Sequence, residues 1–408
     1  MKTILYQICL YCLFFFNTVI SFAQNGWFLQ LPPAIGPTLF SVHFTDSQTG
    51  WAVGNASFIL KTTNGGNTWS LQNTGITNGW FFGVDFINDQ TGWVVGDSGL
   101  ILKTTNGGSN WIVQNCDSNL KFNSVTFINS QTGWVVGDGG VILKTTNGGT
   151  TWITQTSGTS YQLESVFFYD TQIGWAVGEH GKILNTTNGG NNNWNNQTSG
   201  NTNDLLSVYF TDSQTGWAVG YIGVILHTAD GGVTWIAQSI NTIFWLQSVF
   251  FSNSQTGWTV GALGYVYHTT DGGNTWNLQA SSTSNSLFSV YFSNDQTGWA
   301  VGAGNTILKT TNGGGSWIEE TDYNKTQVNY PNPFNSTTKI KYTVSEKELV
   351  LIKIFDISGR EITTLTNEEK PPGEYEINFV ATGLQAGIYY YLIKTGNKTS
   401  AGKMVLVK

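Results

Sequence analysis

Five acidic residues occupy positions at which the repeats of this chain differ from one another. Their carboxylates are the side chains best suited to catalysis. They are Asp97, Asp138, Glu164, Glu179 and Asp204. Glycoside hydrolysis needs two facing carboxyl groups, one of them with a raised pKa, and nothing in the sequence pairs these five. Asp97, Asp138 and Glu179, the last followed by His180, occupy one place in successive repeats. There they would bind a cation or a basic partner, or form a solvated acidic rim, which we favour.

Two tryptophans also depart from the pattern. Of the seventeen Trp residues, two recur in each repeat and Trp27 fits a fourth strand, which leaves Trp80 and Trp245. Both lie four residues before the valine of a predicted inner strand, where other repeats have Lys121, Gln162 or Asp204. At the start of the inner strand, these residues are candidates for a glycan- or peptide-binding platform. Equally, the two indoles would simply cap the core.

The repeat itself predicts the fold. Its clearest copy, Gln131–Trp152, reads QTGWVVGDGGVILKTTNGGTTW, and seven copies follow one another at a spacing of 41 or 42 residues. Short β-rich runs at this period, separated by Gly and Asn turns, are typical of propeller blades. We therefore predict an all-β chain, a seven-bladed β-propeller over residues 24–321. A strand beginning at Trp27 or one beginning at Trp317 closes the ring, and the sequence leaves both open.

The turn T-x-N-G-G-x-T-W, first seen at Thr62–Trp69, resembles the Asp-box or BNR repeat. Its Asn or Asp side chain is expected to cap backbone N–H groups, and its Gly to take positive φ. The whole unit is similar to the repeat of the photosystem II assembly and stability factor family over residues 27–320. That resemblance implies seven blades and a basic, arginine-bearing patch for the partner. Here the propeller has no Arg.

Composition narrows the function further. Residues 24–321 hold six Lys, no Arg and sixteen Asp or Glu, whereas residues 322–408 hold ten Lys, one Arg and nine Asp or Glu. The acidic body argues against nucleic acid as a partner, and the absence of arginines excludes a sialidase, which binds its substrate carboxylate through three of them. Two histidines, His227 and His268, replace a repeated lysine, and we interpret them as surface substitutions. No metal or cofactor is expected.

The two ends of the chain indicate export. Residues 1–23 have the charged start, apolar middle and small final residue of a signal peptide. After a linker at 322–328, residues 329–408 predict a small Ig-like β-sandwich. Its motifs YPNPFN, KIFDISGREI, LQAGIYYY and KMVLVK resemble the type A C-terminal sorting domain of the type IX secretion system of Bacteroidetes. The resemblance implies that the secretion and sorting machinery is a partner and that the protein is secreted or held at the cell surface, not integral to a membrane.

Three functions follow as hypotheses. The first is a secreted, non-enzymatic propeller that binds a protein or glycan. The second is an Asp-box carbohydrate-active enzyme. The third, implied by the family resemblance, is an assembly or stability factor for a membrane complex.

Overall fold

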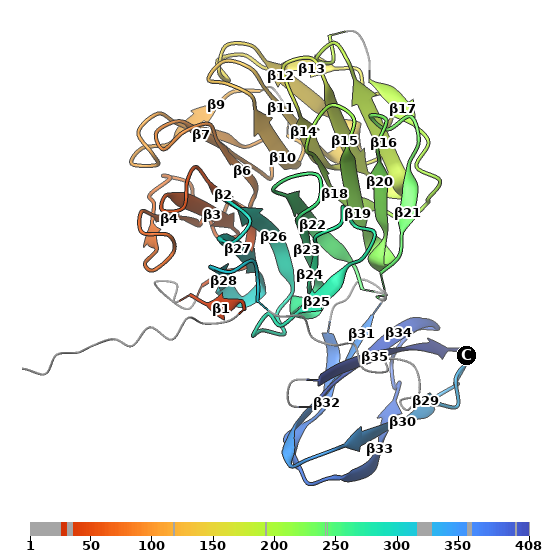
Figure 1. Ribbon diagram of the computed structural model, residues 1–408. Coiled ribbons are helices and arrows are strands. Elements are labelled where there is room, and N and C mark those ends of the chain that lie inside the picture. Colours follow the sequence, from red (N-terminus) through yellow and green to blue (C-terminus); the bar gives the residue numbers. More distant parts are fainter. Residues whose placement is uncertain are drawn as a thin grey trace, which may run out of the picture.

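The computed structural model describes residues 26–30, 36–116, 119–191, 194–240, 242, 244–315, 329–356, 361–395 and 398–407. The fold is all-β: seven four-stranded antiparallel sheets surround a central channel, and two further sheets form a sandwich beside them (Figure 1). The predicted fold class is therefore confirmed. The predicted signal peptide, the linker and Trp317 lie outside the described residues. Within the described part, no helix is long and apolar enough to cross a membrane.

Each blade runs from the channel outward. The innermost strands are β2 (Leu39–Phe44), β6 (Phe81–Phe86), β10 (Phe122–Phe127), β14 (Leu163–Phe168), β18 (Leu205–Phe210), β22 (Leu246–Phe251) and β26 (Leu287–Phe292). The second strands are β3 (Gly50–Gly54), β7 (Gly92–Gly96), β11 (Gly133–Gly137), β15 (Gly174–Gly178), β19 (Gly216–Gly220), β23 (Gly257–Gly261) and β27 (Gly298–Gly302).

The outer half of each blade is shorter. The third strands are β4 (Ile59–Thr62), β8 (Ile101–Thr104), β12 (Ile142–Thr145), β16 (Lys182–Thr186), β20 (Ile225–Thr228), β24 (Val266–Thr269) and β28 (Thr306–Thr310). The outermost are β5 (Ser70–Leu71), β9 (Ile112–Gln114), β13 (Ile153–Gln155), β17 (Asn195–Gln197), β21 (Ile236–Gln238), β25 (Asn277–Gln279) and, in blade seven, β1 (Phe28–Leu29). Short 3-10 turns link second and third strands in five blades: η1 (Asp138–Gly140), η2 (Glu179–Gly181), η3 (Tyr221–Gly223), η4 (Ala262–Gly264) and η5 (Ala303–Asn305).

The two repeated motifs hold neighbouring blades together. Trp51 of blade one is fully buried and stacks on Phe86 of blade two, with ring centroids 3.5 Å apart. Its indole N–H donates to the carbonyl of Gly107 in the next blade's Asp-box turn at 3.3 Å. Inside the first such turn, the Asn64 side chain accepts the N–H of Thr68 at 2.9 Å. The expected capping role of the Asp-box is thus confirmed, and the motif is used for packing.

The N-terminal strand closes the ring. β1 pairs with β28, so the last blade is completed by residues from the start of the chain. Trp27 is buried, and its indole N–H donates to Oε1 of Gln279 at 3.0 Å. Of the two closing strands left open by the sequence, the structure uses the one at Trp27.

The C-terminal sandwich is built from seven strands. One sheet has the order β29 (Asn329–Tyr330), β30 (Thr337–Val344), β33 (Gly373–Val380). The other has the order β32 (Glu361–Lys370), β31 (Glu348–Asp356), β34 (Gly387–Thr395), β35 (Lys398–Leu406). Its core is separate from that of the propeller and contains Ile340, Val350 and Met404. The residues of β32 are mostly polar and partly exposed.

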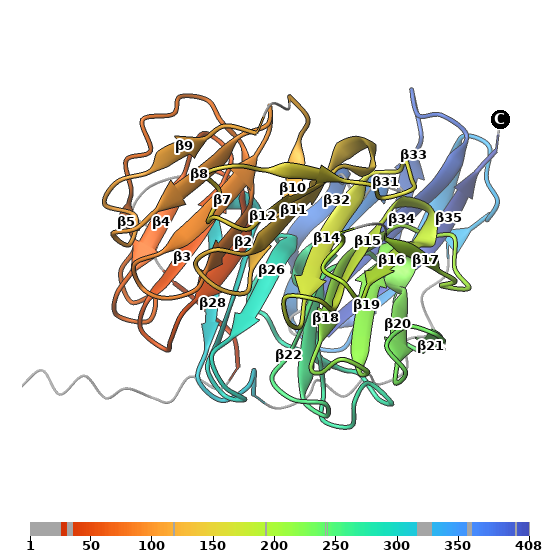
Figure 2. The ribbon, with the colours of Figure 1, turned by 90° about the horizontal axis from the view of Figure 1, so that it is seen from above.

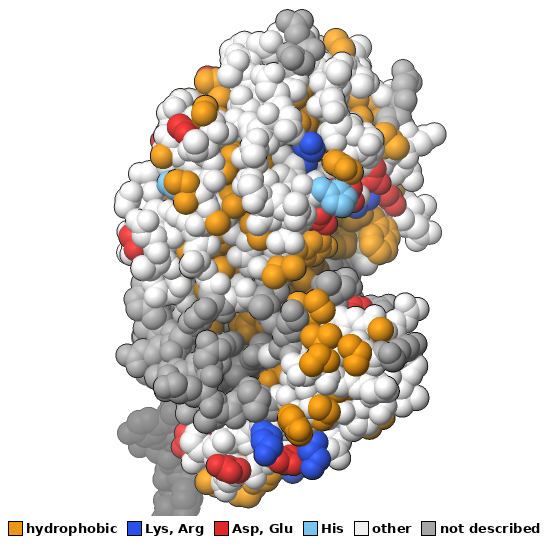
Figure 3. All heavy atoms as spheres, turned by 90° about the vertical axis from the view of Figure 1, so that its right-hand side faces the viewer, with side chains coloured by type: hydrophobic (Ala, Val, Ile, Leu, Met, Phe, Trp, Pro, Cys, Tyr) orange, Lys and Arg blue, Asp and Glu red, His pale blue; other side chains and the backbone are white. Residues whose placement is uncertain are grey.

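The sandwich packs against blade six. Phe355, Tyr390 and Leu392 of the sandwich join one apolar cluster with blade-six residues such as Phe244 and Tyr265. The Phe244 and Tyr390 rings are 5.9 Å apart. The contact lies at the rim of the ring (Figures 1 and 2), and hydrophobic side chains gather around the junction (Figure 3). Blade six departs from the repeat where it meets the sandwich.

His227 and His268 were interpreted from the sequence as surface substitutions, but in the structure each packs against a tryptophan. Where other blades place a lysine ammonium over the second-strand Trp, as Lys61 does at 5.2 Å from Trp51, His268 stacks flat on Trp258 at 4.7 Å. It is only 8% exposed, as is Lys144 in the same slot of blade three. His227 is half-buried against Trp217 at 5.0 Å. The interpretation was wrong for His268.

We expect His268 to make the propeller sensitive to acid. Burial lowers the pKa of His268 from 6.5 to about 4, so between these pH values the unfolded chain binds a proton that the folded chain does not. The free energy of unfolding should therefore fall as the pH drops from 6.5 to about 4, by at most about 3 kcal/mol. His268→Phe keeps the stacked ring without titrating, so urea unfolding should show a smaller fall in this window. Identical pH profiles for the two proteins would contradict the assignment.

Candidate functional site

The inner strands carry an irregularity that builds the site. In every blade the register of the first two strands slips by one residue, as between Leu39 and Ser41 in blade one. The residue in the bulge is two positions before the inner-strand valine, and the slip turns its side chain to the channel instead of the blade interface. We call the end of the channel where the inner strands begin the N-terminal mouth. Its seven bulge residues are Phe40, Phe82, Asn123, Glu164, Leu206, Gln247 and Phe288.

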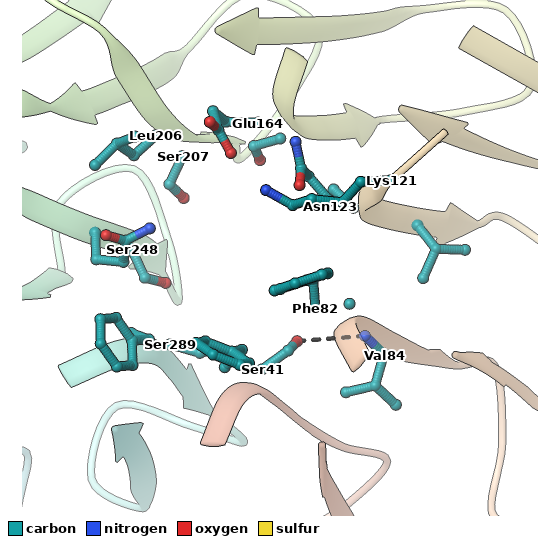
Figure 4. Close-up of a pocket in the computed structure, with 17 residues that line it drawn as sticks. Ser41, Phe82, Val84, Lys121, Asn123, Glu164, Leu206, Ser207, Ser248 and Ser289 are labelled. Atoms are coloured by element: carbon teal, nitrogen blue, oxygen red, sulfur yellow. Dashed lines mark hydrogen bonds between the residues drawn. The ribbon is translucent and has the colours of Figure 1, made fainter. Parts of the chain in front are cut away.

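These residues line a cavity of about 350 Å³ at the centre of the ring (Figure 4). Below them lies a belt of serine hydroxyls, each accepting a valine N–H from the next blade, as Ser41 does from Val84 at 3.3 Å. Blade two has Gly83 instead, where an added Cβ would lie 3.2 Å from the carbonyl oxygen of Asn123. The belt makes the lower wall small and polar, so differences in side-chain size are concentrated at the mouth.

One side of the mouth is aromatic. The ring of Phe40 lies 5.2 Å from that of Phe82 and 5.6 Å from that of Phe288, and we call these three rings the aromatic wall. Trp80 stacks on Phe40 at 6.0 Å with an interplanar angle of 23°. It is 46% exposed, so it extends the aromatic wall out to the surface.

The opposite side is polar and charged. Glu164 lines the cavity and accepts a hydrogen bond from the Gln162 amide. Burial raises the pKa of Glu164, nearby Asp138 and Glu179 act in the same direction, and Lys121 and the Gln162 amide lower it. The ammonium group of Lys121 sits 4.8 Å from the centre of the Phe82 ring. Among the described residues it forms no ion pair.

Three acids at the rim accept backbone N–H groups, whereas Oδ1 of Asp138 is buried without a hydrogen-bond partner among the described residues. Asp97 accepts the backbone N–H of Trp80 at 3.2 Å, Glu179 that of Gln162 at 3.1 Å, and Asp204 that of His180 at 2.8 Å. Each thereby anchors a residue of the same mouth. In the described part of the chain, no group of three or more His, Cys, Asp or Glu side chains is arranged to hold a metal ion.

The two predicted tryptophans differ in their surroundings. Trp80 lies beside the aromatic wall, whereas Trp245 is half-buried, its indole N–H is withdrawn from solvent, and its ring contacts Tyr221 edge-on at 6.3 Å. Trp245 also packs against the cluster shared with the sandwich. Lys121 and Gln162 lie at the same mouth. The structure thus brings Lys121 and Glu164 to one cavity and places Trp80 beside it, stacked on Phe40, with Trp245 and His180 further around the rim.

A repeated glycine fixes the start of each inner strand. In all seven blades, a Cβ on the last residue of the second strand would fall 2.0–2.1 Å from a carbonyl oxygen; at Gly96 that oxygen belongs to Trp80. The same carbonyl accepts the N–H of Asp97 at 3.0 Å. The backbone of Gly137 is extended, with φ −176°, so space and not backbone conformation requires glycine. The repeated glycines therefore position the variable residues.

The opposite mouth of the channel is lined by a chain of rings. Phe167, Tyr209, Phe250 and Tyr291 follow one another at 4.9–5.2 Å, and His43 lies 4.9 Å beyond Tyr291. Burial raises the pKa of Tyr209 to about 12. Nδ1 of His43 lies 2.9 Å from Oδ1 of Asp85, whose other oxygen accepts the N–H of Phe127 at 2.6 Å. These contacts join blades one to three.

Comparison with known proteins decides the family. The family model described as photosynthesis system II assembly factor YCF48 matches residues 22–123, 71–157, 114–199, 150–241 and 191–283. The chain belongs to the YCF48 family. A second model, the secretion system C-terminal sorting domain, matches residues 328–408. Both resemblances proposed from the sequence are confirmed.

Solved YCF48 structures share the propeller. "YCF48 bound to D1 peptide" is 21% identical at a TM-score of 0.62, with 70% of this chain and 97% of that chain covered. YCF48 from Cyanidioschyzon merolae is 22% identical at a TM-score of 0.61, with 70% and 98% covered. The WD40 repeats of RRP9, at 9% identity and a TM-score of 0.60, cover 70% and 97%. Among curated proteins, no match was found.

Sequence reasoning identified Glu164 but missed the other six bulge residues. Strict alternation places the residue two before the valine on the valine's own face, between blades. The bulge reverses this in all seven blades. The available signal was variation: within an otherwise repetitive strand, this position is Phe, Asn, Glu, Leu or Gln.

Proposed function

We propose that the protein is an exported, non-enzymatic propeller that binds a segment of a partner protein at its N-terminal mouth. The observation that carries the proposal is the convergence of the residues that differ between repeats. The aromatic wall, Lys121 and Glu164 line one cavity and Trp80 stacks beside it on Phe40, whereas the repeated residues are used in packing. Partly exposed aromatic rings beside a few polar groups are the usual composition of a binding pocket.

A protein segment is favoured over a glycan by the family. The related propeller described as YCF48 bound to D1 peptide has the same fold, which supports a peptide ligand for this chain as well. The rim of this propeller is acidic, and the propeller contains no arginine. Its partner should therefore differ in charge from a partner that binds a basic patch.

Export is proposed from the C-terminal domain. The match to a secretion system sorting domain over residues 328–408 supports passage through a type IX machinery, with the mature protein secreted or attached to the surface. Deleting residues 329–408 should leave the propeller inside the cell envelope, as measured by fractionation. Unchanged release of the truncated chain would contradict a sorting role.

Binding is tested with the full mature chain as bait against cell-envelope extracts and a glycan array. Trp80→Ala should reduce capture of a specific protein at least about tenfold, because it removes the exposed end of the aromatic wall. Ile153→Ala, at an exposed outer-strand site (61% exposed), is the matched control and should bind normally. Capture of glycans alone, or equal capture by the two variants, would refute the proposal.

A further inference from the structure

The charges around the N-terminal mouth have a consistent sign. Glu164 lies within electrostatic range of Asp138 and Glu179, and Tyr221 within range of Glu164 and Asp204. Of these four acids only Glu164 lines the cavity, where Lys121 is the one cation, and the other three add negative charge around its rim. The potential in the mouth is therefore negative, which attracts cations and repels anions.

Besides the negative potential, a cation site benefits from aromatic ring faces, and the aromatic wall provides them. Ring faces attract cations through their quadrupoles, more strongly where water is excluded. Lys121 shows this within the molecule, because its ammonium group lies over Phe82 and makes no ion pair with a described carboxylate. In Figure 4, Lys121, Phe82 and Glu164 all point into the same cavity. The lysine marks where a positive charge is stable.

We propose that the N-terminal mouth recognises a cationic side chain, Arg or Lys, on an extended segment of the partner. Its charged group lies between the aromatic wall and the carboxylate of Glu164, and its flanking residues lie along Trp80. The cavity of about 350 Å³ has room for one such side chain. Lys121 then acts as an internal competitor, because it occupies the face of Phe82 and lowers the negative potential. This inference rests on the proposed function.

The probes are three capped peptides, each with three copies of Gly-Ser-Xaa, in which Xaa is Arg, norleucine or Glu. Calorimetric titration of the full mature chain should give the Arg peptide an affinity at least about tenfold above that of the norleucine peptide, with no measurable binding of the Glu peptide. Part of this preference should persist at high salt, because cation–ring contacts are screened less than exposed charges. Equal affinities for Arg and norleucine would overturn the inference.

Three variants test the arrangement. Glu164→Gln keeps the side-chain shape and should weaken binding of the Arg peptide about tenfold. Phe82→Leu keeps an apolar wall without a ring and should weaken binding of the same peptide several-fold. Lys121→Ala should strengthen binding of the Arg peptide several-fold. If the mouth were instead an anion site, the same substitution would abolish binding of its ligand. Loss of binding in Lys121→Ala with unchanged unfolding would overturn the inference. If no peptide binds while Trp80→Ala still abolishes partner capture, the inference fails and the proposed function stands.

Discussion

Trp27→Ala should cost the propeller about 3–5 kcal/mol of unfolding free energy, the range for truncating a large buried aromatic residue. Trp27 is 2% exposed, packs edge-on against Phe292 at 5.5 Å and donates to Gln279 at 3.0 Å. Its backbone carbonyl accepts the Ser282 hydroxyl at 2.9 Å. The substitution removes the two side-chain contacts and also loosens β1, which leaves β28 as an open edge.

The measurement is urea unfolding followed by tryptophan fluorescence. All seventeen tryptophans precede residue 318, so this signal reports the propeller and not the sandwich. Leu29→Ala lies on the same short strand, but its side chain is 54% exposed, and it should change stability by less than about 0.5 kcal/mol. Equal effects of the two substitutions would show that β1 does not close the ring through Trp27.

Gly96→Ala should destabilise the propeller by about 3 kcal/mol and displace Trp80. The new methyl group would lie 2.1 Å from the carbonyl oxygen of Trp80, far inside van der Waals contact, so the start of β6 must move. That movement breaks the hydrogen bond from the Asp97 N–H to this carbonyl, which is 3.0 Å long. One methyl group outside the cavity should therefore reduce both stability and partner binding.

The control for Gly96→Ala is Gly387→Ala at the start of β34. An added Cβ there meets nothing within 4 Å, and its φ lies outside the left-handed region. This variant should unfold as the wild-type chain does, as followed by far-ultraviolet circular dichroism because residues 329–408 contain no tryptophan. A Gly96→Ala protein of normal stability and normal partner capture would show that the close approach does not position Trp80.

Much of the fold was predictable because the motifs that pack each blade recur along the chain. The Gly-Trp pair, the Asp-box turn and the spacing of 41 or 42 residues repeat seven times, so each blade confirms the interpretation of the others. Closure by Trp27 was not predictable, since Trp27 and Trp317 begin similar strands. The packing of the sandwich against blade six also required the structure, because Leu278 differs from exposed Leu71 only in its neighbours.

The candidate site was predictable only in part. Subtracting the repeat identified Trp80, Lys121 and the rim acids, which lie at one mouth of the channel. It did not reveal Phe40, Phe82 or Phe288, because phenylalanine in a β-strand is the ordinary residue of a core. Their partial exposure depends on the bulge, and no residue type in the strand indicates that the backbone is irregular there.

Site-specific photocrosslinking in living cells tests the central claim most directly. p-Benzoylphenylalanine at position 80 samples the N-terminal mouth, and the same group at position 153 samples the exposed outer strand β13. We predict a discrete protein adduct from position 80 and none from position 153. The same adducts from both positions, or an adduct from position 153 alone, would contradict binding at the mouth.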